Sequence, residues 1–285
     1  MKTENWSPET DKFLKSGERE LHQFLHATRS EAEMPWASVL EVKKRRWSAL
    51  QKAVGEIGGI RGRVLEVGAG DGWCSAGILR HYDVEECVIV EVDEAAVSKL
   101  IPRMLRTFEV EDKNVTIALG SFNSIPHESH FDFVIAMGAL HHSENLFMTL
   151  RSIWRALKPG GYLLSQEPAM ADGTSNEFYE RRNAEVKKFP EGIEIANSER
   201  SDHFYRKCEY LTALYHAGFE PELEDIGSPH VSESKKRLAD KLIEKLGGIA
   251  PRSDDPNLPT NIFLTARKPE TQMSGMPVTA WEDLL

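Results

Sequence analysis

The densest group of residues able to do chemistry follows a short apolar stretch at residues 63–67. It contains Glu66 and then the closely spaced glycines Gly68, Gly70 and Gly72. Such glycines let the backbone approach a ligand where a Cβ would clash, and they expose the N-terminus of the next helix. Glu91 lies 19 residues beyond Gly72, where a carboxylate can accept both hydroxyl groups of a ribose. Together these features predict a site for a ligand that contains a nucleoside.

The spacing within this loop separates two kinds of nucleoside ligand. A dinucleotide loop has the pattern G-x-G-x-x-G, whose second glycine makes room for a pyrophosphate, whereas this chain has G-x-G-x-G. Glu66, two residues before the first glycine, is poorly suited to a diphosphate and well suited to a cation such as an amino group. An NAD-dependent oxidoreductase is therefore disfavoured.

Further groups that could carry protons follow two later apolar stretches. His141 and His142 come just after residues 131–137, and Glu167 ends the stretch 162–167. Imidazole titrates near neutral pH, so either histidine is a candidate general base, and Glu167 could orient a substrate. The alternative is structural: one histidine caps the next helix, the other packs against the loop, and Glu167 bonds neighbouring backbone.

Short apolar stretches alternating with helical patterns must position these groups. We expect seven strands, at residues 63–67, 87–92, 114–119, 131–137, 162–167, 220–226 and 261–266. We expect the intervening helices after Asp71 and at residues 94–108, 144–157, 204–216 and 233–246. This alternation is typical of an α/β fold with a doubly wound, mostly parallel sheet. In such a sheet the ligand crevice lies beyond the carboxyl ends of the strands, where the groups above would meet.

Three segments flank or interrupt the alternation. Residues 1–60 are expected to form a helical cap segment, with a periodic apolar pattern that ends at Gly58-Gly59. Within the main domain, residues 61–268, the polar stretch 169–203 has no strand-like run and is expected to be a helical insertion, either a lid or a dimer surface. Residues 269–285 are expected to form a flexible tail.

Four ordered motifs resemble those of the class I S-adenosylmethionine-dependent methyltransferases, small-molecule branch. Val64 to Gly72 is similar to their motif I, vLDlGcGtG, and Phe131 to His142 is similar to their fourth-strand motif. Leu157 to Leu163 resembles their LkPGGrl turn, and His216-Ala217-Gly218-Phe219 resembles a late aGF signature. The resemblance spans residues 63–268 and implies a Rossmann-like fold, with S-adenosylmethionine as the cofactor.

Carried over position by position, the resemblance implies a set of cofactor-binding residues. They are Glu66, Gly68, Ala69, Gly70, Gly72, Glu91, Val92, Ser121, Phe122, Met137 and Gly138. Glu66 would lie near the amino group, Glu91 would bind the ribose and Val92 would contact the adenine. Ser121 replaces the acid that usually holds the adenine amino group, so Phe122 and backbone groups would do most of the adenine recognition.

The acceptor is expected to be a small organic molecule, and oxygen is favoured over nitrogen or carbon as the atom that receives the methyl group. The motifs of nucleobase and protein-arginine methyltransferases are missing. The motif of the metal-dependent catechol-type enzymes is missing too, so we expect no metal requirement. Candidate acceptor contacts are Trp47, Tyr179, His203 and Tyr205. The basic run Lys43-Lys44-Arg45-Arg46 could contact an anionic acceptor, but a solvated helix face is favoured. The alternative function is a catalytically silent S-adenosylmethionine-binding partner or sensor.

Composition narrows the partners and the compartment. The formal net charge is −10, which disfavours nucleic acid, because phosphate binding normally needs a basic surface. The sequence has no run of about 18 apolar residues, which a membrane span would need. The opening residues also lack the apolar run of a signal peptide, so we expect a cytoplasmic protein. Cys74, Cys87 and Cys208 are far apart and form no CxxC pair. A homodimer is compatible with all of this.

Overall fold

The structure is a computed structural model, and it describes residues 2–6, 36–143, 145–184, 186–188, 194–196, 203, 205–227 and 260–270. The helix expected at residues 233–246 and the first half of the N-terminal helical segment lie outside these residues. Most of the expected tail also lies outside them, as do Ser201, Asp202 and Phe204 in front of the later helix.

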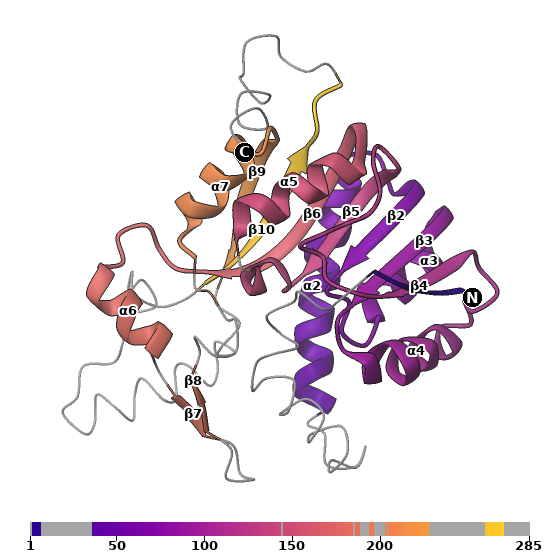
Figure 1. The fold of residues 1–285 in the computed structure, drawn as a ribbon, viewed down its shortest axis with the longest axis horizontal. Coiled ribbons are helices and arrows are strands. Elements are labelled where there is room, and N and C mark those ends of the chain that lie inside the picture. The colour runs from indigo at the N-terminus through magenta and orange to yellow at the C-terminus, as the bar shows by residue number, and fades with distance from the viewer. Residues whose placement is uncertain are drawn as a thin grey trace.

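The core is a single eight-stranded sheet with the order β1-β4-β3-β2-β5-β6-β10-β9 (Figure 1). Its strands are β1 (Lys2–Asn5), β2 (Arg61–Val67), β3 (Asp83–Glu91), β4 (Val115–Leu119), β5 (Phe131–Met137), β6 (Leu157–Ala169), β9 (Glu220–Gly227) and β10 (Thr260–Arg267). All neighbours pair in parallel from β1 to β6, and β10 runs antiparallel to both β6 and β9. The expected doubly wound, mostly parallel α/β sheet is confirmed, with each of the seven expected strands in place.

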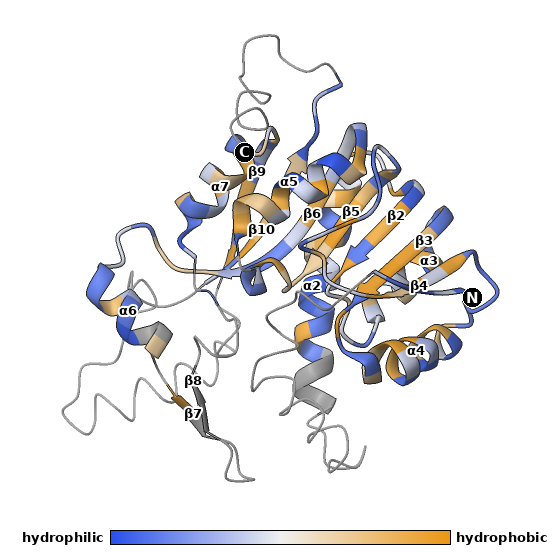
Figure 2. Cartoon of the chain, viewed as in Figure 1, coloured by the Kyte–Doolittle hydropathy of each residue, from blue (hydrophilic) through white to orange (hydrophobic). Residues whose placement is uncertain are grey.

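Helices cover both faces of this sheet (Figure 1). The helical elements among the described residues are α2 (Trp36–Glu56), α3 (Trp73–His81), a π-helical turn η4 (Ala96–Leu100), α4 (Ile101–Thr107), a 3₁₀ turn η5 (Leu140–His142), α5 (Leu146–Ala156), α6 (Asn176–Ala184) and α7 (Lys207–His216). Of these, α6 lies away from the sheet (Figure 1). Buried apolar side chains join α2, α3 and α4 to one face and α5 and α7 to the other. Figure 2 shows the central strands as the most hydrophobic part of the chain, as expected for strands buried on both faces.

An eighth strand, β1, corrects the expected count of seven. It pairs in parallel with β4 at the sheet edge, and Trp6 continues the contact by donating its N–H to the carbonyl of Leu119 at 2.8 Å. The sequence Lys2-Thr3-Glu4-Asn5 is polar and mostly exposed, so it has no apolar alternation that would signal a strand. Backbone pairing with an existing edge forms this strand.

The insertion at 169–203 is only partly helical, which corrects the expectation that it lacks strands. After α6 it contains a small antiparallel ribbon of β7 (Val186–Lys188) and β8 (Glu194–Ala196). Strands of three residues are too short to show a period-two pattern. Several described contacts attach the insertion to the rest of the chain. Among them, the N–H of Met170 donates to Tyr205 O, and the Arg206 guanidinium donates to Thr174 O.

Candidate functional site

The glycine loop lies at the carboxyl end of β2, in the middle of the sheet. Gly68, Gly70 and Gly72 all have left-handed backbone conformations, with φ of +61°, +57° and +76°. A Cβ on Gly68 would lie 2.7 Å from the Cβ of Ala139, so the loop packs tightly on the segment after β5. A Cβ on Gly70 would meet no atom within 4 Å. The loop therefore has one packed side and one open side, which suits close approach of a ligand to the backbone.

Glu91 ends β3 beside this loop, and its carboxylate is held by three backbone N–H groups. It accepts from Gly70 at 2.6 Å, Val92 at 2.7 Å and Asp93 at 3.1 Å. Burial nevertheless raises the pKa of Glu91 above its usual value. The acid predicted to bind a ribose thus contacts the glycine loop directly.

Glu66 is buried beneath the loop, with 1% of its surface exposed. One carboxylate oxygen accepts from the backbone N–H of Ser75 at 2.9 Å and from the hydroxyl of the same residue. Burial outweighs these two donors and raises the pKa of Glu66 to about 7. A nearby cation would shift this group to its charged form, which is the role predicted for it.

The segment after β4 carries the predicted adenine contacts. Ser121 is buried, and its hydroxyl accepts the N–H of Asn123 at 3.1 Å, so it closes a local turn. The ring of Phe122 lies 3.4 Å from the position of a Cβ on Gly68. Phe122 therefore borders the glycine loop, while the Ser121 hydroxyl already has a partner.

His141 and Glu167 form a hydrogen-bonded pair at the carboxyl ends of β5 and β6. The Nδ1 of His141 lies 2.7 Å from Oε2 of Glu167, whose side chain is fully buried. Glu167 also accepts the N–H groups of Ala139, Leu140 and His141 and the hydroxyl of Ser165. Burial favours a neutral Glu167, but the bond from His141 and those from the backbone outweigh it and lower its pKa. Because the carboxylate is charged, Nδ1 of His141 carries the proton, and Nε2 is the basic nitrogen of the neutral ring.

Three other predicted residues lie near this pair. The ring of His142 is 4.0 Å from that of His141, and the backbone N–H of His203 donates to the carbonyl of His141 at 2.9 Å. Tyr205 donates its hydroxyl to the carbonyl of Ser143 at 3.2 Å, and burial raises the pKa of Tyr205 to about 12. The end of the insertion thus contacts the segment that carries both histidines.

Tyr179 and Trp47 make contacts with other elements. Tyr179 lies under the Arg206 guanidinium, 4.8 Å from its ring centre, where α6 meets the start of α7. Trp47 packs on α3: a Cβ on Gly77 would lie 2.8 Å from its ring, and the rings of Trp73 and His81 are 6.4 and 5.5 Å away. The structure therefore places Trp47 in the packing of α2 on α3, and its contact with an acceptor stays a prediction.

The basic run of α2 is divided between solvent and the site. Lys44 and Arg45 are exposed, but Lys43 bonds Asp71 in the glycine loop, and Nη1 of Arg46 donates to the carbonyl of Met137 at 2.9 Å. The favoured expectation of a solvated face is wrong for these two residues. They continue the buried stripe of Leu50 and Val54 at helical spacing, a signal that could have identified them from the sequence.

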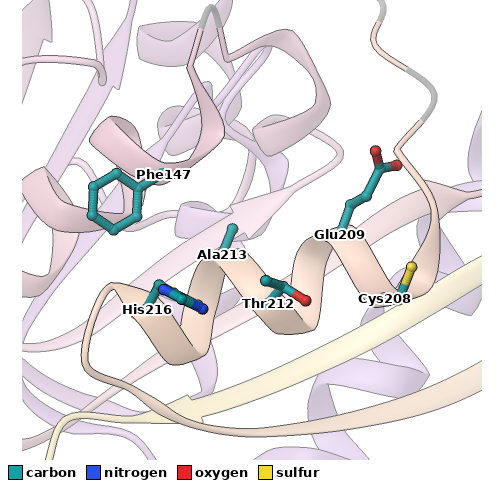
Figure 3. A pocket seen from close by; sticks show the side chains of 6 residues that line it. All are labelled: Phe147, Cys208, Glu209, Thr212, Ala213 and His216. Carbon is teal, nitrogen blue, oxygen red and sulfur yellow. The ribbon is translucent and has the colours of Figure 1, made fainter.

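A groove of about 580 Å³ lies elsewhere, between α5 and α7 (Figure 3). It is lined by Phe147 and by residues along α7, among them Cys208, Ala213 and His216. None of the residues predicted for the site lines it. The absence of a metal requirement and a homodimer both stay predictions.

The described helices were compared with the length and hydrophobicity that a membrane span needs. No helix among them is both long enough and apolar enough to span a bilayer.

The comparisons with known proteins agree with this geometry. A methyltransferase domain family matches residues 38–223, which is more than half of the chain. The sterol 24-C-methyltransferase of Debaryomyces hansenii is 30% identical over 164 residues, covering 57% of this chain and 41% of that protein. The polyamine aminopropyltransferase of Desulforudis audaxviator is 34% identical over 111 residues, covering 36% of this chain and 40% of that protein. The chain spans less than half the length of the curated relatives it matches.

A solved structure supports the same class of fold. The phosphoethanolamine N-methyltransferase 2 of Haemonchus contortus, in complex with S-adenosyl-L-methionine, aligns with a TM-score of 0.55 at 19% identity. The alignment covers 79% of this chain and 52% of that one. The fold is thus the Rossmann-like fold of class I methyltransferases. The chain belongs to the methyltransferase domain family, and its cofactor is S-adenosylmethionine.

The described residues fit this cofactor. The open side of Gly70 leaves room for a ligand against the backbone, and Glu91 stands beside it at the end of β3. Glu66 is a buried carboxylate that a cationic amino group would ionise.

Proposed function

We propose that this protein transfers a methyl group from S-adenosylmethionine to the oxygen of a small organic acceptor, with His141 as the general base. The observation that carries the proposal is the bond between Nδ1 of His141 and Glu167, which is held in place by four further donors. Such a partner fixes the tautomer of the ring and stabilises the imidazolium that forms when the base takes a proton.

The reaction is an in-line displacement at a sulfonium carbon. The bound cofactor supplies an activated methyl group. With this group bound, a lone pair of the acceptor would form the new bond to the methyl carbon, and the electron pair of the C–S bond would leave with S-adenosylhomocysteine. The acceptor's proton passes to Nε2 of His141. Much of the rate comes from positioning and from exclusion of water, so the base adds to an effect that exists without it.

The remaining assignments extend this proposal to binding. Glu91 binds the ribose, Glu66 faces the amino group, and Met137, Gly138 and Phe122 border the cofactor. His203 and Tyr205 contact the acceptor, because both contact the segment that carries His141. Tyr179 is proposed with them because it packs against Arg206, the residue after Tyr205. Glu167 is a positioning residue, since it acts through His141.

Single-turnover formation of S-adenosylhomocysteine with a panel of small hydroxyl and amine acceptors tests the proposal. For an accepted hydroxyl, we expect His141→Ala to reduce the rate by about 100-fold or more, within the usual range for a general base. His216→Ala, an exposed histidine on α7, is the matched control and should stay near wild type. We expect Glu167→Gln to shift the acidic limb of the pH–rate profile, because the ring loses its anionic partner. A purely structural role would lower the rate without moving that limb.

Two outcomes would count against this proposal. Rates within about twofold of wild type when both His141 and His142 are changed to Ala would leave positioning alone and remove the base. The second candidate, a silent S-adenosylmethionine-binding partner, is favoured by Ser121, whose hydroxyl closes a local turn where an acid is usual. It predicts calorimetric binding of S-adenosylhomocysteine together with no turnover on any acceptor.

A further inference from the structure

Arg46 reaches from the inner face of α2 to the carboxyl end of β5. Its Nη1 donates to the carbonyl of Met137 at 2.9 Å, and a Cβ on Gly138 would lie 2.9 Å from its Nη2. Gly138 has a φ of +80°, which is a left-handed backbone conformation. Because glycine has no Cβ, the guanidinium can approach the backbone there. Arg46 thus lies directly against the segment that leads from β5 to His141.

The guanidinium of Arg46 has most of its hydrogen-bonding capacity unused. An arginine has five N–H donors, and among the described residues Arg46 makes one hydrogen bond and no ion pair. Its neighbour Lys43 differs, because it is neutralised by Asp71. Burial lowers the pKa of Arg46 from its usual value, and the nearby charge of Glu167 partly offsets this shift. Glu167 does not bond Arg46, because its oxygens accept from other donors. A half-buried cation without a counter-ion is costly, and an anionic ligand would remove that cost.

A buried acceptor lies beside the same segment. Gln166 is 2% exposed, and it is the register partner of Met137 on the adjacent strand. Its Nε2 donates to Asn261 at 2.9 Å, whereas its Oε1 is buried with no hydrogen-bond partner in the described part of the chain. Its carbonyl accepts the N–H of Gly138 at 2.7 Å. Unused donors and an unused acceptor therefore flank the residues Met137 and Gly138.

We propose that Arg46 is the binding residue for a carboxylate in this site, with Gln166 accepting an N–H or O–H group of the same ligand. The inference rests on the proposed function and names a recognition residue for it. A planar fork of donors matches a carboxylate, and a cation with no ion pair in the described part of the chain matches a single negative charge. The carboxylate has two possible sources: the methionyl part of the cofactor, or an acceptor that is itself an organic acid.

Three probes separate these sources in calorimetric titrations. S-adenosylhomocysteine carries the amino-acid group, and 5′-methylthioadenosine is the same kind of thioether without it. Benzoate, added to protein saturated with S-adenosylhomocysteine, stands in for a carboxylate on the acceptor. Glu91→Ala is the reference for nucleoside binding and should weaken both adenosine ligands by about tenfold or more.

Arg46→Met is the main variant, and Arg45→Met on the exposed side of α2 is its matched control. If the carboxylate belongs to the cofactor, Arg46→Met weakens S-adenosylhomocysteine by about tenfold or more and leaves 5′-methylthioadenosine within twofold. If it belongs to the acceptor, both adenosine ligands bind as in wild type, and benzoate binding to the saturated protein is lost. Arg46→Lys keeps the charge without the fork, so a smaller loss is expected for the same ligand, and it serves if Arg46→Met does not fold.

The proposal is overturned if wild type binds S-adenosylhomocysteine while Arg46→Met, or the folded lysine variant, binds all three probes as wild type does. It is also overturned if Arg46→Met weakens both adenosine ligands equally, because the effect would then concern the nucleoside or the fold. Failure of wild type to bind S-adenosylhomocysteine would instead contradict the proposed function, so the two failures are distinguishable.

Discussion

Two buried carboxylates at the residue scale show how local donors decide the charge of an acid. Glu66 has two donors, both from Ser75, and burial raises its pKa to about 7. Glu167 has five donors, among them His141, and its pKa lies below the usual value. Both side chains are excluded from water, so the number and charge of the donors make the difference. Glu167 can hold a protonated imidazole, whereas Glu66 responds to a cation that arrives.

The raised pKa of Glu66 predicts a pH-dependent stability. Its folded pKa of about 7 exceeds the reference value of 4.5, so its stabilising contribution is complete below 4.5 and is lost as the pH rises through 7. Glu66→Gln stays neutral throughout. We therefore expect its free energy of unfolding, relative to wild type, to increase between pH 5 and pH 8, by up to about 3 kcal/mol. Urea unfolding at several pH values measures this, and parallel pH profiles for the two proteins would refute it.

At the scale of elements, α2 determines much of the site's geometry. The C-terminal half of α2 packs Leu50 and Val54 into the core. Glycines 58 and 59 follow the end of the helix, and the N–H of Gly59 donates to Val54 O at 2.9 Å. The N-terminal half of α2 brings Lys43 to the glycine loop and Arg46 to the end of β5. Trp47 packs the helix on α3, which begins directly after the glycine loop. A change in the packing of α2 on α3 should therefore affect the loop.

Two glycines in helices provide a matched test of this packing. In Gly77→Ala the new Cβ would lie 2.8 Å from the Trp47 ring, so we expect destabilisation of about 1–3 kcal/mol. In Gly55→Ala the Cβ would meet no atom within 4 Å, and alanine favours the helix by about 0.5–1 kcal/mol. Trp47→Phe should restore part of the stability of Gly77→Ala. Equal melting temperatures for the two alanine variants would contradict the proposed contact.

At the scale of the whole molecule, the accessibility of two buried cysteines can show whether the core unfolds as one unit. Cys74 and Cys87 are fully buried in different hydrophobic clusters, whereas Cys208 is exposed on α7. Burial raises the pKa of Cys74 well above its usual value and that of Cys87 to about 12, so neither is a reactive thiolate at neutral pH.

We expect the folded protein to take one maleimide label, at Cys208, and the unfolded protein to take three. Cys74 lies on α3, and Cys87 lies on β3 against the same helix, with its Sγ 3.6 Å from Ser75 Oγ. They should therefore become labelled together as urea unfolds the chain. Mass spectrometry of intact and digested protein gives the number and position of the labels. Rapid labelling of Cys74 in buffer, with Cys87 still protected, would show that α2 opens by itself.

Periodicity and spacing predicted the parts of this protein that local sequence controls. The seven strands, the glycine loop, and the acids Glu66, Glu91 and Glu167 were all identifiable, because buried strands are apolar and sharp loops need glycine. The polar strand β1 and the ribbon of β7 and β8 were not, since edge pairing and three-residue strands leave no such pattern.

Tertiary structure alone decided how the charged groups are partnered. Residues 43 and 46 lie far along the chain from Asp71 and Met137, and only the packing of α2 on the sheet joins them. The same holds for His141 and Glu167, which meet because β5 and β6 are parallel neighbours whose carboxyl ends lie together. Residue types and their spacing therefore determined the fold and the class of cofactor. Contacts between distant segments determined which nitrogen of His141 is basic and how the cations of α2 are partnered among the described residues, because these depend on distance and burial in space.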